Sequence, residues 1–170
     1  MVRRSSHRDT GVDAPEAGGS LTPLAGVAAG PWRALSARAA EPNGYYLPEW
    51  ELAVNASARG RLDAAALGAW RDASTLIGLM PVISMWRAYK IPLPALVSAD
   101  PYGTLCTPLL DRGLAEEAVT GIMQQARQAG AHALIFRAIP LDGAAMRAFT
   151  EVLRRGGMQP TVLQSHVRAC

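Results

Sequence analysis

The sequence contains only two cysteines, Cys106 and Cys170. Two cysteines cannot build the disulfide network that holds small secreted domains together, and these two lack the close spacing of a metal-binding pair. The three histidines, His7, His132 and His166, are equally scattered along the chain. We therefore expect a protein of a reducing compartment, the cytoplasm, with no bound metal.

Long hydrophobic runs are also missing. The most apolar stretch, residues 76–86, is much shorter than the roughly 20 residues of a membrane-spanning helix, and it contains Pro81 and Ser84. Near the N-terminus, acidic residues separate Arg3 and Arg4 from a mildly apolar stretch, which is a poor pattern for a signal peptide. The sequence therefore predicts no membrane span and no secretion signal.

Lysine is almost absent, because 16 of the 17 basic residues are arginine and the other is Lys90. These cations stand singly or in pairs, and the formal net charge is only +3. A nucleic-acid-binding surface needs clustered cations with aromatic residues between them, so we expect no nucleic-acid partner. A hydrophobic content of 49% with 18% charged residues is typical of a globular protein.

The rest of the chain is organised around residues 67–86. Residues 67–70 and 76–86 are apolar and partly β-favouring, and residues 71–74 form a polar break between them. This pattern predicts a β-hairpin. Pro81 has no N–H to donate to a β-ladder, so we expect an edge strand or a bulge at that position.

Before the hairpin, residues 1–30 are rich in Gly, Ser and Pro without any period, which predicts a disordered tail. Order is expected to begin at Pro31, with one short helix over residues 31–40 and a second over residues 48–54. The remaining residues, 31–170, are expected to form one domain.

After the hairpin, the sequence predicts a short strand at residues 96–99 and an extended piece at residues 104–109. An apolar stripe over residues 115–126 predicts a helix capped by Asp111 and ended by Gly130. A strand at residues 133–136, buried on both faces, should precede a helix that Asp142 caps and residues 156–157 end. A strand at residues 161–168 should close an α/β (α+β) fold, with a mixed, largely antiparallel sheet flanked by helices.

Aromatic residues are the candidate substrate-binding groups. The candidates are Tyr45 and Tyr46, which lie on a predicted loop, Trp50 and Tyr102, together with Trp86 and Tyr89. Two interpretations remain open. The aromatic rings line a pocket, or Trp50 and Trp86 belong to the core and the tyrosines to its rim.

Nucleophilic catalysis is a further alternative. Cys106 with His166 or His132 would make a small cysteine hydrolase, although a thiol in an apolar strand is typical of a core residue. The sequence around it has no nucleophile elbow. Residues 154–157, Arg-Arg-Gly-Gly, end a helix instead of opening one, so they predict a helix cap and not a phosphate-binding loop.

Several segments, taken in order, resemble one family: Trp32-Arg33-Ala34-Leu35, residues 41–43 and 48–50, the strand at 77–81, residues 103–111, and the closing residues 165–169. Together they are similar to the first half of the CelD-like (cellulose biosynthesis type) acyltransferases of the GNAT superfamily. The resemblance covers residues 31–169. It implies a GNAT-like fold and N-acyltransferase chemistry that uses acetyl-CoA or another acyl-CoA.

In that family a second GNAT-like half normally follows the closing strand and carries the acyl-CoA-binding and transfer site. This sequence ends at Cys170 and has no Arg/Gln-x-x-Gly-x-Gly/Ala loop before a helix. The resemblance therefore implies a half-domain, truncated before its partner half, that binds no cofactor itself and to which no catalytic residue can be assigned. Its partner would be the missing half or a second copy. The alternative function is a non-catalytic interaction module that dimerises or pairs through an exposed apolar face.

Overall fold

The computed structural model describes residues 21–57, 64–99, 102 and 105–165. They form a six-stranded sheet with the strand order β1-β2-β3-β4-β6, and β5 pairs with β3. All pairs are antiparallel except β4 with β6. The predicted α/β class with a mixed, largely antiparallel sheet is confirmed. The strands are β1 (Thr22–Pro23), β2 (Ala65–Trp70), β3 (Leu76–Ser84), β4 (Ala95–Ser98), β5 (Leu109–Leu110) and β6 (Ala133–Ile135).

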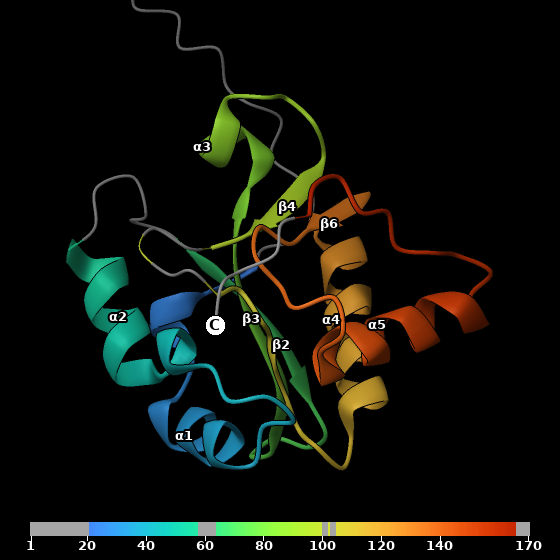
Figure 1. Ribbon diagram of the computed structural model, residues 1–170. Coiled ribbons are helices and arrows are strands. Elements are labelled where there is room, and N and C mark those ends of the chain that lie inside the picture. The colour runs from blue at the N-terminus through green and yellow to red at the C-terminus, as the bar shows by residue number, and fades with distance from the viewer. Residues whose placement is uncertain (1–20, 58–63, 100–101, 103–104, 166–170) are drawn as a thin grey trace, which may run out of the picture.

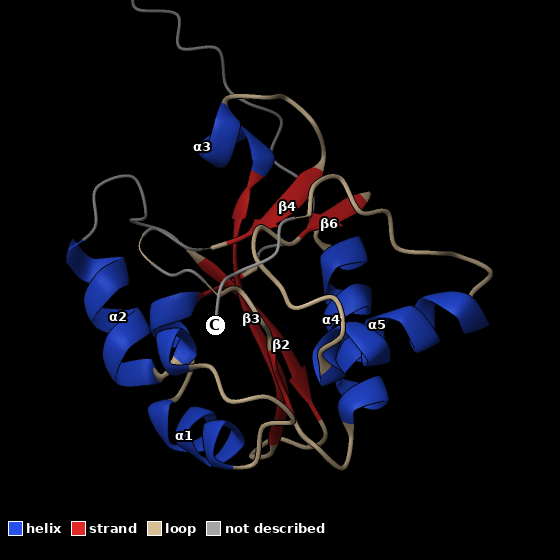
Figure 2. Ribbon diagram, in the orientation of Figure 1, coloured by secondary structure: helices blue, strands red, loops and turns tan. Residues whose placement is uncertain are grey.

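Helices cover both faces of the sheet (Figures 1 and 2). One face carries α1 (Ala29–Ala37), α2 (Pro48–Ser57) and the 3-10 turns η1 (Leu24–Gly26) and η2 (Gly44–Tyr46), and the other carries α4 (Ala115–Gln128) and α5 (Ala144–Arg155). A short helix, α3 (Met85–Tyr89), extends from one end of the sheet. Within the part of the chain that the structure describes, no helix is long and apolar enough to cross a membrane.

Each face of the sheet has its own hydrophobic core. The α1 side buries, among others, Leu24, Trp32, Leu35, Tyr46 and Leu79. The α4 side buries, among others, Ile77, Met80, Ala118, Val119 and Ile122. Since β3 contributes to both cores, it is buried almost throughout, as its long apolar run requires.

The predicted hairpin is confirmed. Its turn is closed by a hydrogen bond from the Arg71 N–H to the Thr75 carbonyl at 3.0 Å. Asp72 Oδ1 accepts hydrogen bonds from the backbone N–H groups of Ser74 and Thr75, each at 2.9 Å. The bonds from Ser74 and Thr75 lower the pKa of Asp72 to about 2. The second strand ends at Ser84, earlier than predicted, because the Ser84 side chain accepts from the Arg87 N–H and starts α3.

The expectation that Pro81 lies at an edge or a bulge is wrong. Strand β3 is central, with β2 on one side and β4 and β5 on the other, and the register shift in the hairpin lies at Ala69/Trp70. Extending the β3–β4 register by one pair places Pro81 opposite Ala99, and the Ala99 N–H donates to the Pro81 carbonyl at 2.8 Å. The return bond of such a pair needs an N–H on residue 81, which proline lacks.

Order begins before Pro31, so the predicted limit of the tail is wrong. Leu24 is fully buried, and its N–H donates to the Ala64 carbonyl at 2.9 Å. Helix α1 begins at Ala29, two residues before the proline. Residues 21–28 show no period because they contain a strand of two residues and a single 3-10 turn. The rest of the expected tail, residues 1–20, lies outside the described residues.

Two predicted helix caps are wrong. The N-cap of α4 is Leu114, and Asp111 instead accepts from the Gly113 N–H at 2.9 Å. The N-cap of α5 is Gly143, and the N–H of the next residue, Ala144, donates to the carboxylate of Glu41. The predicted ends are confirmed, because Gly130 and Gly157 adopt positive φ angles of 79° and 71° directly after the helices.

The two last predicted strands differ from expectation. Strand β6 is not buried on both faces: Ala133 is exposed, and the next two residues are half-buried. Its side chains Leu134 and Ile135 pack against the two cores. The ring of Phe136, directly after β6, packs edge-on against Phe149 of α5 with centroids 4.9 Å apart. Residues 161–165 form no strand, and residues 166–168 lie outside the described part.

Candidate functional site

Two of the four predicted substrate-binding residues contact each other. The rings of Tyr45 and Trp50 meet edge to face, with centroids 6.1 Å apart, where η2 leads into α2. Trp50 is 45% exposed and Trp86 of α3 is 43% exposed. The interpretation that placed both tryptophans in the core is therefore wrong, and an aromatic surface is open beside α2.

Tyr46 lies beneath this surface and is almost completely buried. Its backbone carbonyl accepts a hydrogen bond from Trp32 Nε1 at 2.8 Å, and its hydroxyl donates to the Ala99 carbonyl at 3.3 Å. A side chain held in this way supports the fold and presents no ring to a substrate. Tyr102, the fourth predicted residue, is 65% exposed. Its immediate neighbours lie outside the described residues.

The position of Tyr45 depends on Asn43, which the sequence reasoning missed. Asn43 Nδ2 donates to the Thr107 carbonyl at 2.8 Å and to the Leu105 carbonyl at 3.4 Å, while its Oδ1 accepts from the Tyr45 N–H at 3.0 Å. One buried amide thus joins the turn before α2 to residues 105–107. Asparagine after proline in the sequence Glu-Pro-Asn-Gly indicates a turn, but not the distant segment that the turn binds.

The geometry gives no support to the hydrolase alternative. Cys106 is fully buried, and its N–H donates to the Ala138 carbonyl at 2.6 Å. His132 is exposed at the start of β6, where its backbone N–H donates to the Pro94 carbonyl. His166, the other proposed base, lies outside the described residues. A nucleophilic thiol must meet its substrate, and this thiol has no exposed surface.

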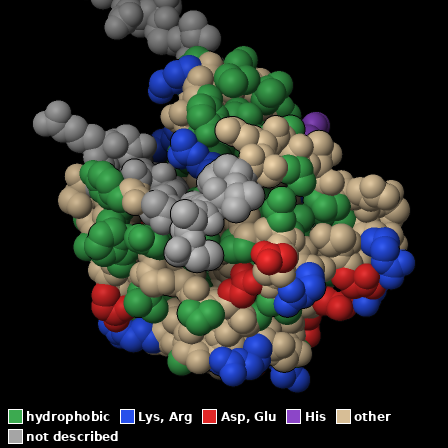
Figure 3. Space-filling view, in the orientation of Figure 1, with side chains coloured by type: hydrophobic (Ala, Val, Ile, Leu, Met, Phe, Trp, Pro, Cys, Tyr) green, Lys and Arg blue, Asp and Glu red, His purple; other side chains and the backbone are tan. Residues whose placement is uncertain are grey.

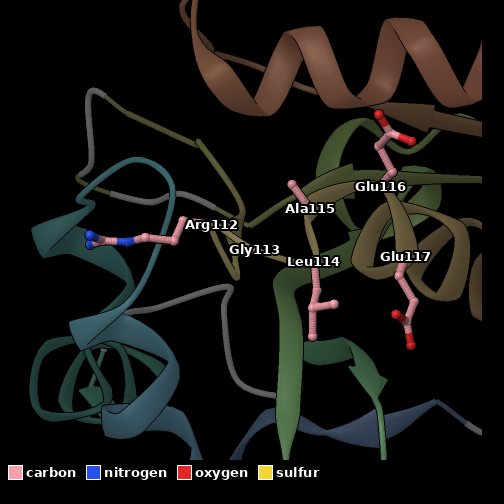
Figure 4. A pocket seen from close by; sticks show the side chains of 6 residues that line it. All are labelled: Arg112, Gly113, Leu114, Ala115, Glu116 and Glu117. Atoms are coloured by element: carbon pink, nitrogen blue, oxygen red, sulfur yellow. The ribbon is translucent and has the colours of Figure 1, made fainter.

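A pocket of about 310 Å³ opens at the start of α4, lined by Arg112, Gly113, Leu114, Ala115, Glu116 and Glu117. Figure 4 shows that its charged side chains diverge: Arg112 points toward the α1–α2 side, and Glu116 and Glu117 point in opposite directions. Glu116 accepts a hydrogen bond from Arg155 of α5 at 2.6 Å. Because the two glutamates supply negative charge to the first turn of α4, the pocket does not suit a phosphate.

Next to this pocket, Arg38 and Asp111 form an ion pair that joins the end of α1 to the end of β5. Arg38 Nη2 also donates to the Leu76 carbonyl at 2.7 Å. Burial acts to raise the pKa of the Asp111 carboxyl. The hydrogen bonds from Arg38 and from the Gly113 N–H, with the charges of Arg38 and Arg112, outweigh burial and hold that pKa below its usual value. The pair is fully engaged in joining these elements, which is a structural role.

Among the residues described, no group of three or more His, Cys, Asp or Glu side chains is placed to hold a metal ion. No family model, no curated protein and no solved structure matches the chain. A functional proposal therefore rests on the geometry of the described residues and on the expectation from the sequence segments that resemble the CelD-like family.

Proposed function

We propose that this chain is a GNAT-like half-domain, similar to the first half of a CelD-like acyltransferase, that pairs with a second half and leaves acyl-CoA binding to that half. Three observations support the proposal. The mixed sheet with helices on both faces has the architecture expected for such a half. The aromatic surface at Tyr45 and Trp50 offers one wall for an acceptor substrate. The pocket at α4 has the wrong charges for a pyrophosphate.

The observation that carries the proposal is the edge of the sheet at β6. In the described part of the chain, β6 pairs only with β4. The Ala99 N–H donates to Pro81 of β3, so by alternation the N–H groups of Leu96 and Ser98 in β4 point toward β6. In the parallel β4–β6 register the N–H groups of Ala133 and Ile135 point back toward β4, and that of Leu134 points away from it. An edge with unpaired N–H groups is a template for another strand.

Apolar side chains follow along the chain after α5. Met158, Val162 and Leu163 are 40%, 54% and 81% exposed. In Figure 1 this segment turns back from α5 toward the β6 side of the molecule. Exposed apolar side chains near an open edge are typical of a surface that a further domain covers.

The first experiment is a calorimetric titration of the whole chain with acetyl-CoA, with desulfo-CoA as a control ligand. We expect no binding heat, because the chain contributes the acceptor side only. Micromolar binding of acetyl-CoA together with turnover of an amine would show that the chain holds its own cofactor, and the half-domain proposal would be wrong.

The second candidate function is an interaction module that pairs with its own copy through the same edge. Light scattering over a protein concentration series tests it, with Ala133→Lys as the variant, because an exposed lysine on an edge strand opposes strand pairing. Ala73→Lys in the exposed hairpin turn is the matched control. A dimer that Ala133→Lys abolishes and Ala73→Lys retains supports the module, and a monomer at every concentration excludes self-pairing.

A further inference from the structure

The end of the molecule at α3 carries a group of four exposed apolar side chains. Trp86, Tyr89, Ile91 and Leu93 are 43%, 45%, 41% and 57% exposed and lie within eight residues of sequence. We call residues 85–94 the α3 tip. Figures 1 and 3 show that the tip projects beyond the sheet and that green, apolar atoms gather there. Its surface is convex, unlike a groove that takes up a ligand.

The tip is held in shape by its own backbone. Lys90 closes α3 in the left-handed conformation, and its N–H donates to the Trp86 carbonyl at 2.8 Å. Successive hydrogen bonds of 2.9 and 2.8 Å run from the Leu93 N–H to Ile91 and from the Ala95 N–H to Leu93. At its base, Ser84 of β3 pairs with Leu96 of β4. The apolar side chains are thus presented to solvent by a fixed scaffold.

The charges of the tip have one sign. Lys90 Nζ lies 5.8 Å from the centre of the Trp86 ring, and the Arg137 guanidinium lies 5.4 Å from the centre of the Tyr89 ring. Arg87 adds a third cation on α3 itself. Residues 85–94 contain no acidic side chain. In the view of Figure 3, the red carboxylate atoms lie away from the tip.

We propose that the α3 tip binds the surface of an anionic lipid bilayer, with its aromatic rings at the headgroups and Ile91 and Leu93 inserted below them. Tryptophan and tyrosine favour the membrane interface, aliphatic side chains gain by burial among the acyl chains, and cations are attracted to anionic headgroups. A second copy docked tip to tip would bring cations against cations, which argues against that occupant. The inference is independent of the proposed pairing at β6.

The test is cosedimentation of the full chain with vesicles. One set contains phosphatidylcholine alone, and the other contains phosphatidylcholine with phosphatidylglycerol. We expect binding to the anionic vesicles that weakens at high salt and little binding to the neutral ones. Leu93→Ser and Lys90→Glu should each lower the partition onto anionic vesicles about tenfold.

Two variants away from the tip serve as matched controls. Leu163→Ser removes an exposed leucine after α5, and Arg71→Glu reverses an exposed charge in the hairpin turn. Both should bind vesicles as the parent chain does. The proposal is overturned if the parent chain stays in the supernatant with anionic vesicles at low salt, or if the controls lose as much binding as the tip variants. It is also overturned if the chain forms a dimer that Leu93→Ser dissociates, because the tip would then be a protein interface.

Discussion

The Tyr46 hydroxyl donates a hydrogen bond to the carbonyl of Ala99 at 3.3 Å. This carbonyl lies opposite Pro81 in the β3–β4 register, where a ladder bond would come from the N–H of any other residue. A side chain from η2 therefore supplies the donor that the proline withholds from the centre of the sheet. The bond explains both why Pro81 is tolerated in a central strand and why Tyr46 is buried.

Replacement of Tyr46 by phenylalanine should cost about 1–2 kcal/mol in the free energy of unfolding, because a buried carbonyl loses its hydroxyl donor. In a Pro81→Ala background the same replacement should cost much less, since the N–H of Ala at position 81 can donate to Ala99. Urea unfolding of the four proteins in this double-mutant cycle measures the difference. Equal losses in the two backgrounds would refute the compensation.

This compensation marks the limit of what the sequence could predict. Local pattern predicted the hairpin at residues 67–86, the stripe of α4 and the glycine ends at Gly130 and Gly157, because each depends on residues close together in the chain. The place of Pro81 depends on Tyr46, and the cap of α5 depends on Glu41, 103 residues before the N–H it accepts from. Neither Tyr46 nor Glu41 lies at a sequence distance from its partner that would predict the contact.

The candidate site likewise combines contacts between residues close in the chain, which the sequence can predict, with contacts between distant residues, which it cannot. Tyr45 and Trp50 are five residues apart across the start of α2, and their contact follows from local geometry. Tyr46 is adjacent to Tyr45 in sequence but points into the core, which composition alone does not reveal. Asn43 is the residue that fixes this turn to residues 105–107, and its three hydrogen bonds are visible only in the folded chain.

Asp111 should make stability depend on pH at the acid end. Its pKa is lowered in the folded chain, so its stabilising effect is fully present above the unfolded value of about 3.9 and is lost as the pH falls through the lower folded value. Asp111→Asn should lower the free energy of unfolding by about 1–3 kcal/mol at neutral pH. It should also make the free energy of unfolding fall less steeply as the pH becomes acidic. Unfolding curves measured at intervals from neutral to strongly acidic pH test both effects. If the free energy of unfolding of the variant falls with acid pH as steeply as that of the parent chain, Asp111 is not the cause of the pH dependence.

Two glycines in helices should respond in opposite directions to alanine. A Cβ at Gly121 of α4 would lie 2.8 Å from the Cβ of Ala69 in β2, whereas a Cβ at Gly30 of α1 meets nothing within 4 Å. Gly30→Ala should therefore stabilise by up to about 1 kcal/mol through helix propensity. Gly121→Ala should destabilise by about 1–3 kcal/mol despite the same gain, because α4 must move off the sheet.

Thermal unfolding of both glycine variants gives the comparison directly. Adding Ala69→Gly to Gly121→Ala removes the Cβ that would clash and should recover part of the loss. If Gly121→Ala is as stable as the parent chain without this second change, the close approach of α4 to β2 does not limit packing there.

The capping of α5 by Glu41 should be worth about 1 kcal/mol, within the usual range of 0.5–2 kcal/mol for an N-terminal cap. Its carboxylate accepts the Ala144 N–H and places negative charge at the positive end of the helix. Glu41→Ala should lose the whole effect, and Glu41→Gln should lose less because an amide oxygen still accepts. Glu49→Ala is the matched control: its carboxylate also lies in the first turn of a helix, α2, but it pairs with Arg33 on the exposed surface, where the helix dipole and the ion pair contribute little. Urea unfolding should rank Glu41→Ala below Glu41→Gln and leave Glu49→Ala near the parent chain. If Glu41→Ala proves no less stable than Glu49→Ala, the contact between the two distant segments does not support α5.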